Sequence, residues 1–429
     1  MTTTAPPQTP TSFLTDLTLW ISFGVLLTSV NSFWQPRIAI ESISDTGSGT
    51  AFRQIIYIAI MVWGVLLCLF NKRLTMLSNL MSVSLGLLLI WAGLSLFWSI
   101  APAIGFRRYV LTVVTVVTVF ALSTLTSPLQ FLTRFRQTIV FLSIASLVTA
   151  LLVPELGIHQ PGDPESSVIG DWRGVFYHKN ILGSVLAPGI IIIVFELLSG
   201  TKTKKTALYL SLILMAFLLV KSGSKTSISI TFLSVLFLWF SLTADRRKGG
   251  LGLLLGTIYA LSLIAIFGIF YWINERLGTA LIEPDAFTGR GLIWTSMIEM
   301  AHDKLLFGMG FQSIFQTGLN SPLRHVFGGS QFLMTLPHAH NAYVEMLISI
   351  GVIGLGLFLF ALVIVPFFHT FRSSRDYSNL RFACLAIFAF VWLHSFLEVG
   401  LLDRDRIDWI VFLVSYSALR HIPKQEASR

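Results

Sequence analysis

Charged residues and cysteines are scarce in this sequence. Only 12% of the 429 residues are Asp, Glu, Lys or Arg, whereas 54% are hydrophobic, and the mean hydropathy is +0.76. Because soluble globular proteins carry about 25% charged residues, this composition excludes a soluble globular chain. The two cysteines, Cys68 and Cys384, lie in apolar runs, so we expect small buried side chains there and no disulfide framework.

Three further features are missing. The phosphate-binding pattern Gly-x-x-x-x-Gly-Lys-Ser/Thr does not occur, so nothing in the sequence indicates an ATP-driven reaction. No internal repeat points to a doubled transporter fold. Residues 1–10 lack the charged and short apolar regions of a signal peptide, and we therefore expect the first apolar run to be an uncleaved anchor.

Long apolar runs dominate the rest of the chain. A helix of about 20 apolar residues crosses a hydrocarbon core of ~30 Å, and continuous rather than alternating runs favour helices over barrel strands. We predict an all-α integral membrane protein, a single polytopic domain over 1–429 with about twelve transmembrane helices. The predicted spans are 14–34, 54–71, 77–99, 106–125, 137–153, 181–199, 206–221, 226–244, 251–273, 342–370, 381–399 and 408–420.

Two long polar segments lie on the same predicted face. A modest excess of Lys and Arg in the opposite short loops predicts that both termini are cytoplasmic, which puts segments 154–180 and 274–339 outside. Their face is still rich in cations and suits an anionic ligand. From Leu292 to about His302 the apolar residues have helical spacing, which predicts a short amphipathic helix on the membrane surface and a partly helical large loop.

His340 is the strongest catalytic candidate because it stands where the large loop re-enters an apolar span. A neutral imidazole can take a proton from a hydroxyl group. On a continuous helix, eleven residues at about 100° each bring Gly351 near the His340 face, and Gly354 lies close by. We expect both glycines to let a neighbouring helix pack closely. The alternative is an interfacial histidine at a helix start that Asn341 caps.

Arg173 and Arg290 are the candidate anion-binding residues. Each is flanked by glycine in one of the two long outer segments. A planar guanidinium stays charged and binds phosphate through two hydrogen bonds, which suits a diphosphate. The alternative is that both side chains snorkel at the membrane boundary beside Trp172 and Trp294.

Several polar residues are supporting candidates. A pair of histidines two residues apart resembles metal ligands, but no acidic or cysteine set stands nearby in sequence, so we predict no metal site. Carboxylates close to a span orient the arginines or form structural ion pairs. The sign-alternating segment 403–408 predicts a solvated turn, with a lining of the acceptor path as the alternative. The supporting residues are Lys179, His338, Asn341, Glu345, Glu398 and Arg404.

These residues resemble a known family. His340, Asn341, Gly351 and Gly354 form His-Asn-x9-Gly-x-x-Gly, which is similar to the signature of the O-antigen ligase and Wzy-type polymerase superfamily of bacterial membrane glycosyltransferases. Arg173 and Arg290 fall where that family carries its diphosphate-binding arginines. Within the superfamily, three segments most resemble the ExoQ-type exopolysaccharide polymerases: 98–108, 173–180 and 287–290.

The resemblance implies a GT-C-like fold in the bacterial inner membrane, with an active site that faces the periplasm. It implies an inverting, metal-independent glycosyl transfer without a cofactor. The donor would be an oligosaccharide on undecaprenyl diphosphate, held by Arg173 and Arg290, while His340 would position or deprotonate the acceptor hydroxyl. Membrane lipids and a chain-length regulator are the other implied partners, and no nucleic acid is expected.

Three functions stay open from the sequence. A polymerase would join exopolysaccharide or O-antigen repeat units, and a ligase with the same chemistry would transfer the glycan to a lipid A-core acceptor. A transporter or flippase for lipid-linked oligosaccharides would place polar residues near mid-span and break equivalent helices in two halves. The charged residues of this chain gather at one face instead, which favours the enzymes.

Overall fold

A computed structural model describes residues 12–28, 51–163, 166–200, 203–248, 290–315, 323, 338–372, 378–404 and 406–422. Within these residues every regular element is a helix, and extended residues pair only in the isolated bridge between Ile158 and Trp172. The all-α prediction is confirmed for this part of the chain. Each predicted span coincides with a helix or a bent pair of helices, except 251–273, which lies outside the described residues.

The described residues form the following helices, in the order of the sequence. They are α1 (Phe13–Thr28), α3 (Ala51–Phe70), α4 (Leu74–Leu80), α5 (Val83–Leu94), η1 (Ser95–Trp98), α6 (Pro102–Ser123), α7 (Pro128–Leu152), α8 (Pro154–Gly157), η2 (Ser166–Val168), α9 (Lys179–Ser199), α10 (Lys205–Lys221), α11 (Lys225–Lys248), α13 (Arg290–Met300), η4 (His302–Lys304), α16 (Ala342–Leu359), the π-helical η6 (Phe360–Ile364), α17 (Val365–Arg372), α18 (Ser378–His394) and α19 (Ile407–Arg420).

Six of the described helices are long and apolar enough to cross a membrane. They are Phe52–Phe70, Pro102–Ser123, Pro128–Leu152, Lys179–Ser199, Lys225–Thr243 and Ala342–Thr370. The pair formed by α4 and α5–η1, bent by 78°, makes a seventh if it counts as one span. The chain is therefore a multi-pass membrane protein, and the larger predicted number of about twelve spans stays a prediction.

The helix ends follow local sequence signals. Proline occupies the first turn of α6 and α7, where its missing N–H costs no helical hydrogen bond. Ser127 caps α7 by accepting a hydrogen bond from the N–H of Gln130. Gly200 ends α9 in the left-handed conformation, with a φ of 67°.

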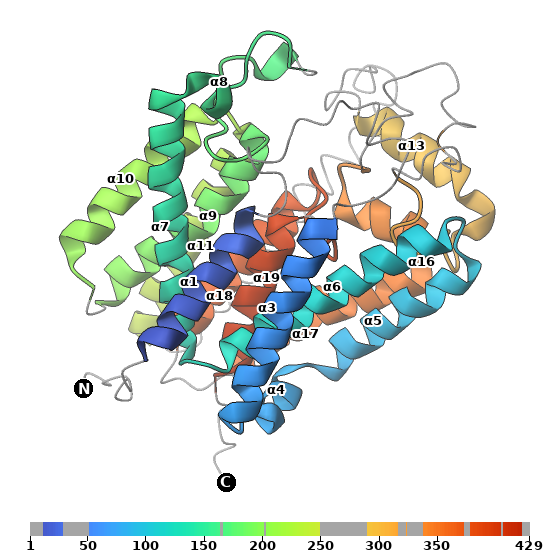
Figure 1. The fold of residues 1–429 in the computed structure, drawn as a ribbon, viewed down its shortest axis with the longest axis horizontal. Helices are drawn as coiled ribbons and strands as arrows, with labels where there is room; N and C mark the ends of the chain where they lie inside the picture. Colours follow the sequence, from blue (N-terminus) through green and yellow to red (C-terminus); the bar gives the residue numbers. More distant parts are fainter. Residues whose placement is uncertain are drawn as a thin grey trace.

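Helix α19 forms the centre of the bundle. It contacts α6, α7, α9 and α18, and nearly all its side chains are buried, among them Trp409, Phe412 and Tyr416 (Figure 1). The outer helices expose large apolar residues, such as Ile55 on α3 and Ile213 on α10. Exposed apolar side chains on long helices suit contact with lipid, because the hydrocarbon core of the bilayer is itself apolar and contains no water.

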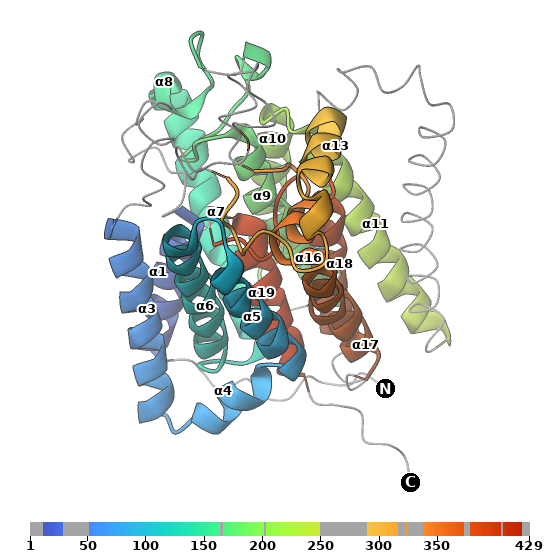
Figure 2. The same cartoon turned by 90° about the vertical axis from the view of Figure 1, so that its right-hand side faces the viewer.

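The long connections gather at one end of the bundle. Helix α4 lies at one end, and α8 and α13 lie at the other (Figures 1 and 2). Helix α19 ends beside α4, where the guanidinium of Arg420 donates to the carbonyls of Asn79 and Leu80. The opposite end carries the described segments that precede α9 and α19, together with residues 338–341 before α16, and it holds the candidate site.

Helix α13 confirms the short helix predicted in the large loop, but its apolar face is not free to lie on a membrane. Ile293, Met297 and Ala301 are buried in an apolar cluster with Ala339 and Ile348. The helix thus packs against the chain that leads into α16. This packing connects the first described residue of the loop, Arg290, to the histidine segment.

The expected continuous helix behind His340 is wrong at Gly351. This residue has φ 75° and ψ −178°, so α16 breaks there. The segment after η4 fills the break: the N–H of Met309 donates to Ile348 and the N–H of Val352 donates to Leu305, at 2.9 and 2.8 Å. A glycine is needed because a Cβ would lie 2.6 Å from the carbonyl carbon of Phe307.

Gly351 therefore admits a non-helical segment rather than a neighbouring helix. Gly354 is buried, and a Cβ there would meet the side chain of Ile350, which the break places beside it. The expectation that both glycines share a helix face with His340 is wrong, because His340 itself precedes the helix.

Candidate functional site

A carboxylate from the α18–α19 connection is the centre of the site. Oε1 of Glu398 lies 3.1 Å from Nη2 of Arg290 and 3.1 Å from Nδ2 of Asn180. Its Oε2 lies 3.5 Å from Nδ1 of His340. Glu398 follows the end of α18, so the predicted span 381–399 ran one turn too far. The fold thus brings three distant parts of the chain onto one acidic side chain.

His340 stands immediately before α16 in a strained conformation. Its φ is +53°, and its N–H donates to Nδ1 of His338 at 3.2 Å. Asn341 starts the helix by accepting hydrogen bonds from the N–H groups of Tyr343 and Val344. Left-handed backbone is uncommon outside glycine and is often retained where a side chain must be aimed.

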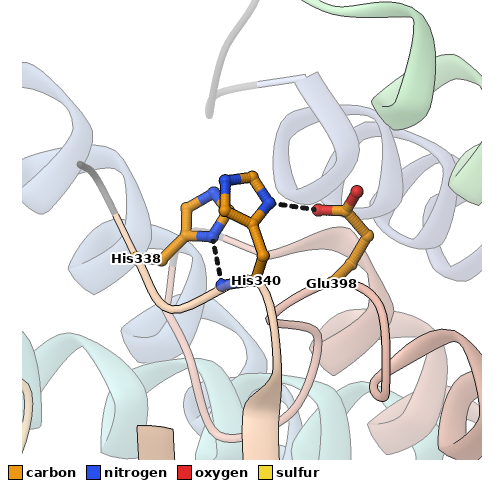
Figure 3. Close-up of side chains that lie close together, drawn as sticks. All are labelled: His338, His340 and Glu398. Carbon is orange, nitrogen blue, oxygen red and sulfur yellow. Dashed lines mark hydrogen bonds and ion pairs between the residues drawn. The ribbon is translucent and has the colours of Figure 1, made fainter. Parts of the chain in front are cut away.

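The two ring nitrogens of His340 differ in their surroundings, because only Nδ1 lies beside the carboxylate of Glu398. Figure 3 shows the ring between His338 and Glu398, with the two imidazole centroids 4.0 Å apart. The side chain is 27% exposed, and within the described part of the chain no hydrogen bond to Nε2 occurs. A carboxylate beside Nδ1 favours the tautomer with the proton on Nδ1, which leaves the lone pair on Nε2.

The surroundings of Glu398 and of His338 determine the ionisation state of each side chain. Burial raises the pKa of Glu398, but the hydrogen bond and charge of His340 and the guanidinium of Arg290 outweigh it and lower the pKa to about 2. Burial, together with the positive charges of Arg406 and Arg290, lowers the pKa of His338 well below its usual range. Glu398 is therefore an anion and His338 is neutral.

Arg290 belongs to this group and begins α13. Its side chain is 18% exposed, and one terminal nitrogen contacts Glu398. A guanidinium has five N–H donors in a planar fork. The cation predicted for anion binding therefore lies beside the carboxylate that also contacts His340.

The structure does not bring Arg173 into the same group. Its side chain is 5% exposed, and its guanidinium donates to the carbonyls of Leu156 and Glu155 and contacts Asp163 at 3.3 Å. These partners all lie in the α7–α9 connection. In this conformation the guanidinium of Arg173 binds groups of its own loop.

Lys179 is also engaged within this connection. Its Nζ lies 2.5 Å from Oδ2 of Asp171 in an ion pair at the start of α9. The next residue, Asn180, reaches Glu398 but was not among the predicted site residues. The His-Lys-Asn sequence before the apolar run of α9 was the available signal, because polar residues at a helix start point out of the bundle end.

Glu345 and Arg404 lie in a neighbouring buried network. Oε2 of Glu345 accepts the N–H of Ala339 at 3.0 Å, which supports the segment that carries the histidines. Arg404 donates to the side chain of Gln312 at 2.7 Å, and Gln312 in turn donates to the carbonyl of Leu402. Gln312 and Arg404 thus connect the 308–315 segment to the α18–α19 connection.

The prediction of a solvated turn at 403–408 is wrong. Asp403 and Arg404 are buried, and Asp408 is buried 2.8 Å from Nδ1 of His394. Asp405 lies outside the described residues. Within the segment Asp403 pairs with Arg404 and Arg406, at 4.0 and 3.7 Å. Asp408 instead pairs with His394 of α18, a partner that sequence spacing cannot reveal.

Three of these side chains have a spacing that a metal ion could use. His338, His340 and Glu398 each place one ligand atom within 4.8 Å of the others. Glu398 supplies the acid that the sequence did not show beside the two histidines. However, its Oε1 already accepts from Arg290 and Asn180, and Nδ1 of His338 accepts the N–H of His340. A fixed guanidinium this close opposes a divalent cation.

Comparison with known proteins supports the resemblance noted in the sequence. Residues 210–359 match a family model described as O-Antigen ligase, and this range includes Arg290, His340, Gly351 and Gly354. No curated protein matches the chain. The matched segment supports the similarity of this chain to the O-antigen ligase and Wzy-type superfamily.

Proposed function

We propose that this protein is a GT-C-like membrane glycosyltransferase that takes a glycan from undecaprenyl diphosphate and joins repeat units into an exopolysaccharide or O-antigen polymer. The observation that carries the proposal is the position of Glu398 between His340 and Arg290. The pair of histidine and carboxylate suits proton transfer, and the guanidinium suits a diphosphate. The family match supports this class of enzyme.

In the proposed reaction His340 is the general base. Its Nε2 takes the proton from an acceptor hydroxyl while that oxygen attacks the anomeric carbon of the donor. The bond between the anomeric carbon and the diphosphate oxygen breaks, and the bonding electrons leave with the lipid diphosphate. Attack from the opposite side inverts the anomeric configuration. Glu398 stabilises the imidazolium and holds the ring with Nε2 towards the acceptor.

Arg290 is proposed to bind the diphosphate of the donor. One terminal nitrogen contacts Glu398, and the remaining donors of the guanidinium can bind phosphate oxygens. Negative charge grows on the diphosphate as the glycosidic bond breaks, so a fixed cation lowers the barrier more than it stabilises the ground state. The reaction needs no metal ion in this proposal. Arg173 would join Arg290 only if it left its loop partners.

The proposed location is the bacterial inner membrane, with the α8 and α13 end facing the periplasm, where lipid-linked glycans and a chain-length regulator meet the enzyme. The ExoQ-like segments favour a polymerase. A ligase that transfers the glycan to lipid A-core uses the same chemistry and differs only in its acceptor. A lipid-linked oligosaccharide flippase is the remoter alternative, because it needs no base beside a diphosphate site.

The test is His340→Ala in a reconstituted membrane assay with a defined undecaprenyl-diphosphate oligosaccharide. We expect no glycan longer than the starting oligosaccharide, because the acceptor loses its base. The matched control is His302→Ala, since His302 is 81% exposed at the same end of the bundle. Persistence of long polymer in His340→Ala, with normal insertion, would disprove the role of the histidine. Transfer that requires added lipid A-core would identify a ligase instead.

A further inference from the structure

We infer that Arg173 is a positioning residue that acts, through the start of α9 and Asn180, on the carboxylate of Glu398. This inference rests on the proposed function, because Glu398 matters there as the partner of His340. It assigns Arg173 a role other than direct contact with the diphosphate. It also assigns Asn180 a place in the reaction.

The first link is the loop that Arg173 closes. Its guanidinium contacts Asp163 at 3.3 Å and donates to the carbonyls of Leu156 and Glu155 at 2.9 and 3.2 Å. The N–H groups of Arg173 and Gly174 both donate to the carbonyl of Gly157. With 4% of the residue exposed, Arg173 connects the start of this loop to its end in a buried setting.

The second link is the carboxylate of Asp163, which contacts both Arg173 and His159. Oδ2 of Asp163 contacts both Arg173 and Nδ1 of His159, the latter at 2.7 Å. Nε2 of His159 in turn accepts the N–H of Lys179 at 3.2 Å. These contacts require one tautomer, with the proton on Nδ1 and the acceptor lone pair on Nε2. Asp163 therefore orients the ring that receives the first N–H of α9.

The third link is the first turn of α9. Nδ1 of His178 accepts the N–H of Asn180 at 3.2 Å, and Lys179 forms its ion pair with Asp171. Two histidines thus bind two consecutive N–H groups of the helix start, where no helical partner exists. The backbone of Asn180 is fixed as a result, and its side chain can reach only a defined position.

The last link is the hydrogen bond from Asn180 to Glu398. Nδ2 of Asn180 and Nη2 of Arg290 both donate to Oε1, each at 3.1 Å. The other oxygen, Oε2, is the one that faces His340. Asn180 therefore holds the carboxylate in the orientation that suits the base, and a loose α9 start would release it.

The substitution Asp163→Asn separates this role from direct binding of the diphosphate. If Arg173 positions the loop, loss of the Asp163 charge weakens its contact with Arg173 and disturbs His159. We then expect kcat to fall about tenfold with an unchanged donor KM, the scale expected for one hydrogen bond to a charged group. If Arg173 binds the diphosphate, Asp163→Asn frees the guanidinium. The donor KM should then fall and kcat should not, which would overturn the inference.

Asn180 is tested with Glu398 in a double-mutant cycle. If Asn180 acts only through the carboxylate, Asn180→Ala lowers kcat about tenfold in the wild-type background and has no further effect in Glu398→Gln. Equal factors in both backgrounds would overturn the inference. The control is Asn79→Ala, an exposed asparagine at the opposite end of the bundle, which we expect to leave kcat unchanged.

A measurement that needs no catalytic turnover tests the inference in variants that fold poorly. Amide hydrogen exchange at the start of α9 should be faster in Arg173→Ala and Asp163→Asn than in wild type, with unchanged exchange in α19. Slow exchange at the α9 start in both variants would contradict the inference. If the proposed function itself fails, wild-type protein will not elongate the donor and His340→Ala will change nothing. Failure of the inference alone leaves an active wild type and an inactive His340→Ala variant.

Discussion

Nδ1 of His340 lies 3.5 Å from Oε2 of Glu398, although one residue precedes α16 and the other follows α18. The carboxylate also contacts Arg290, so it neutralises one cation while it orients the proposed base. This arrangement lets one anionic side chain place an imidazole and a guanidinium side by side without a buried net charge. Paired burial of this kind is stable only when each partner stays in position.

Arg290→Lys keeps the positive charge but loses the planar fork. We expect the donor KM to rise about tenfold, because an ammonium cannot bind two phosphate oxygens and Glu398 in one fixed geometry. The measurement is initial rate against donor concentration in proteoliposomes. The matched control is Arg107→Lys, an exposed arginine of α6. A donor KM equal to that of wild type would argue against the diphosphate role of Arg290.

Metal removal should leave activity unchanged. Glu398 already accepts hydrogen bonds from Arg290 and Asn180, so a divalent ion would have to compete with a fixed cation. The measurement is the rate of glycan elongation after dialysis against EDTA, together with the metal content of the purified protein. Activity that disappears with EDTA and returns with Zn²⁺ would make His338, His340 and Glu398 a metal centre instead.

Acidification should loosen the loop that contains His159. Burial lowers the pKa of His159 below its usual value, despite the opposing hydrogen bond that His159 donates to Asp163, and the charges of His178 and Arg173 lower it further. Because the folded loop binds the proton less well than the open loop, its stability is full above about pH 6.5 and declines as the pH falls below that value.

Hydrogen exchange of residues 154–180 between pH 7.5 and 5.5, corrected for the intrinsic rate, measures this effect. We expect protection to decrease over that interval in wild type and to depend less on pH in His159→Gln. Protection that stays constant down to pH 5.5 would show that protonation of His159 does not open the loop.

Gly351→Ala should destabilise the fold. A residue with a side chain is strained at a φ of 75°, and a Cβ would approach the carbonyl carbon of Phe307 to 2.6 Å. Strain of this kind costs about 1–3 kcal/mol, before any cost of displacing the 305–310 segment. The measurement is the free energy of unfolding in detergent. Gly356→Ala is the control in the same helix, where a Cβ meets nothing within 4 Å. Equal stability of the two variants would contradict the assigned role of the break.

Several features of the fold could be predicted because their causes are local. Apolar runs form helices in lipid since each backbone group finds its partner within the segment. The spacing of Ile293 and Met297 predicted α13, and the buried Cys68 and Cys384 followed from their apolar neighbours. Asn341 at the start of α16 carries a side chain that can accept from the first free N–H groups, and it does.

Other features needed the tertiary structure. The break at Gly351 depends on a segment that approaches from another part of the chain, and the buried ion pair of Asp408 depends on His394 at the end of α18. The placement of Arg173 in its own loop likewise follows from the carbonyls that surround it.

By itself, the sequence determined that this protein is a helical membrane protein, and it singled out His340 and Arg290 as residues whose chemistry suits glycosyl transfer. Only the tertiary structure decided that Glu398 and Asn180 complete their surroundings. The physical reason is the distance along the chain over which each interaction acts. Helix formation and hydrophobicity act between near neighbours in the chain, whereas the partners of a buried charge are chosen by which helix ends the packing brings together.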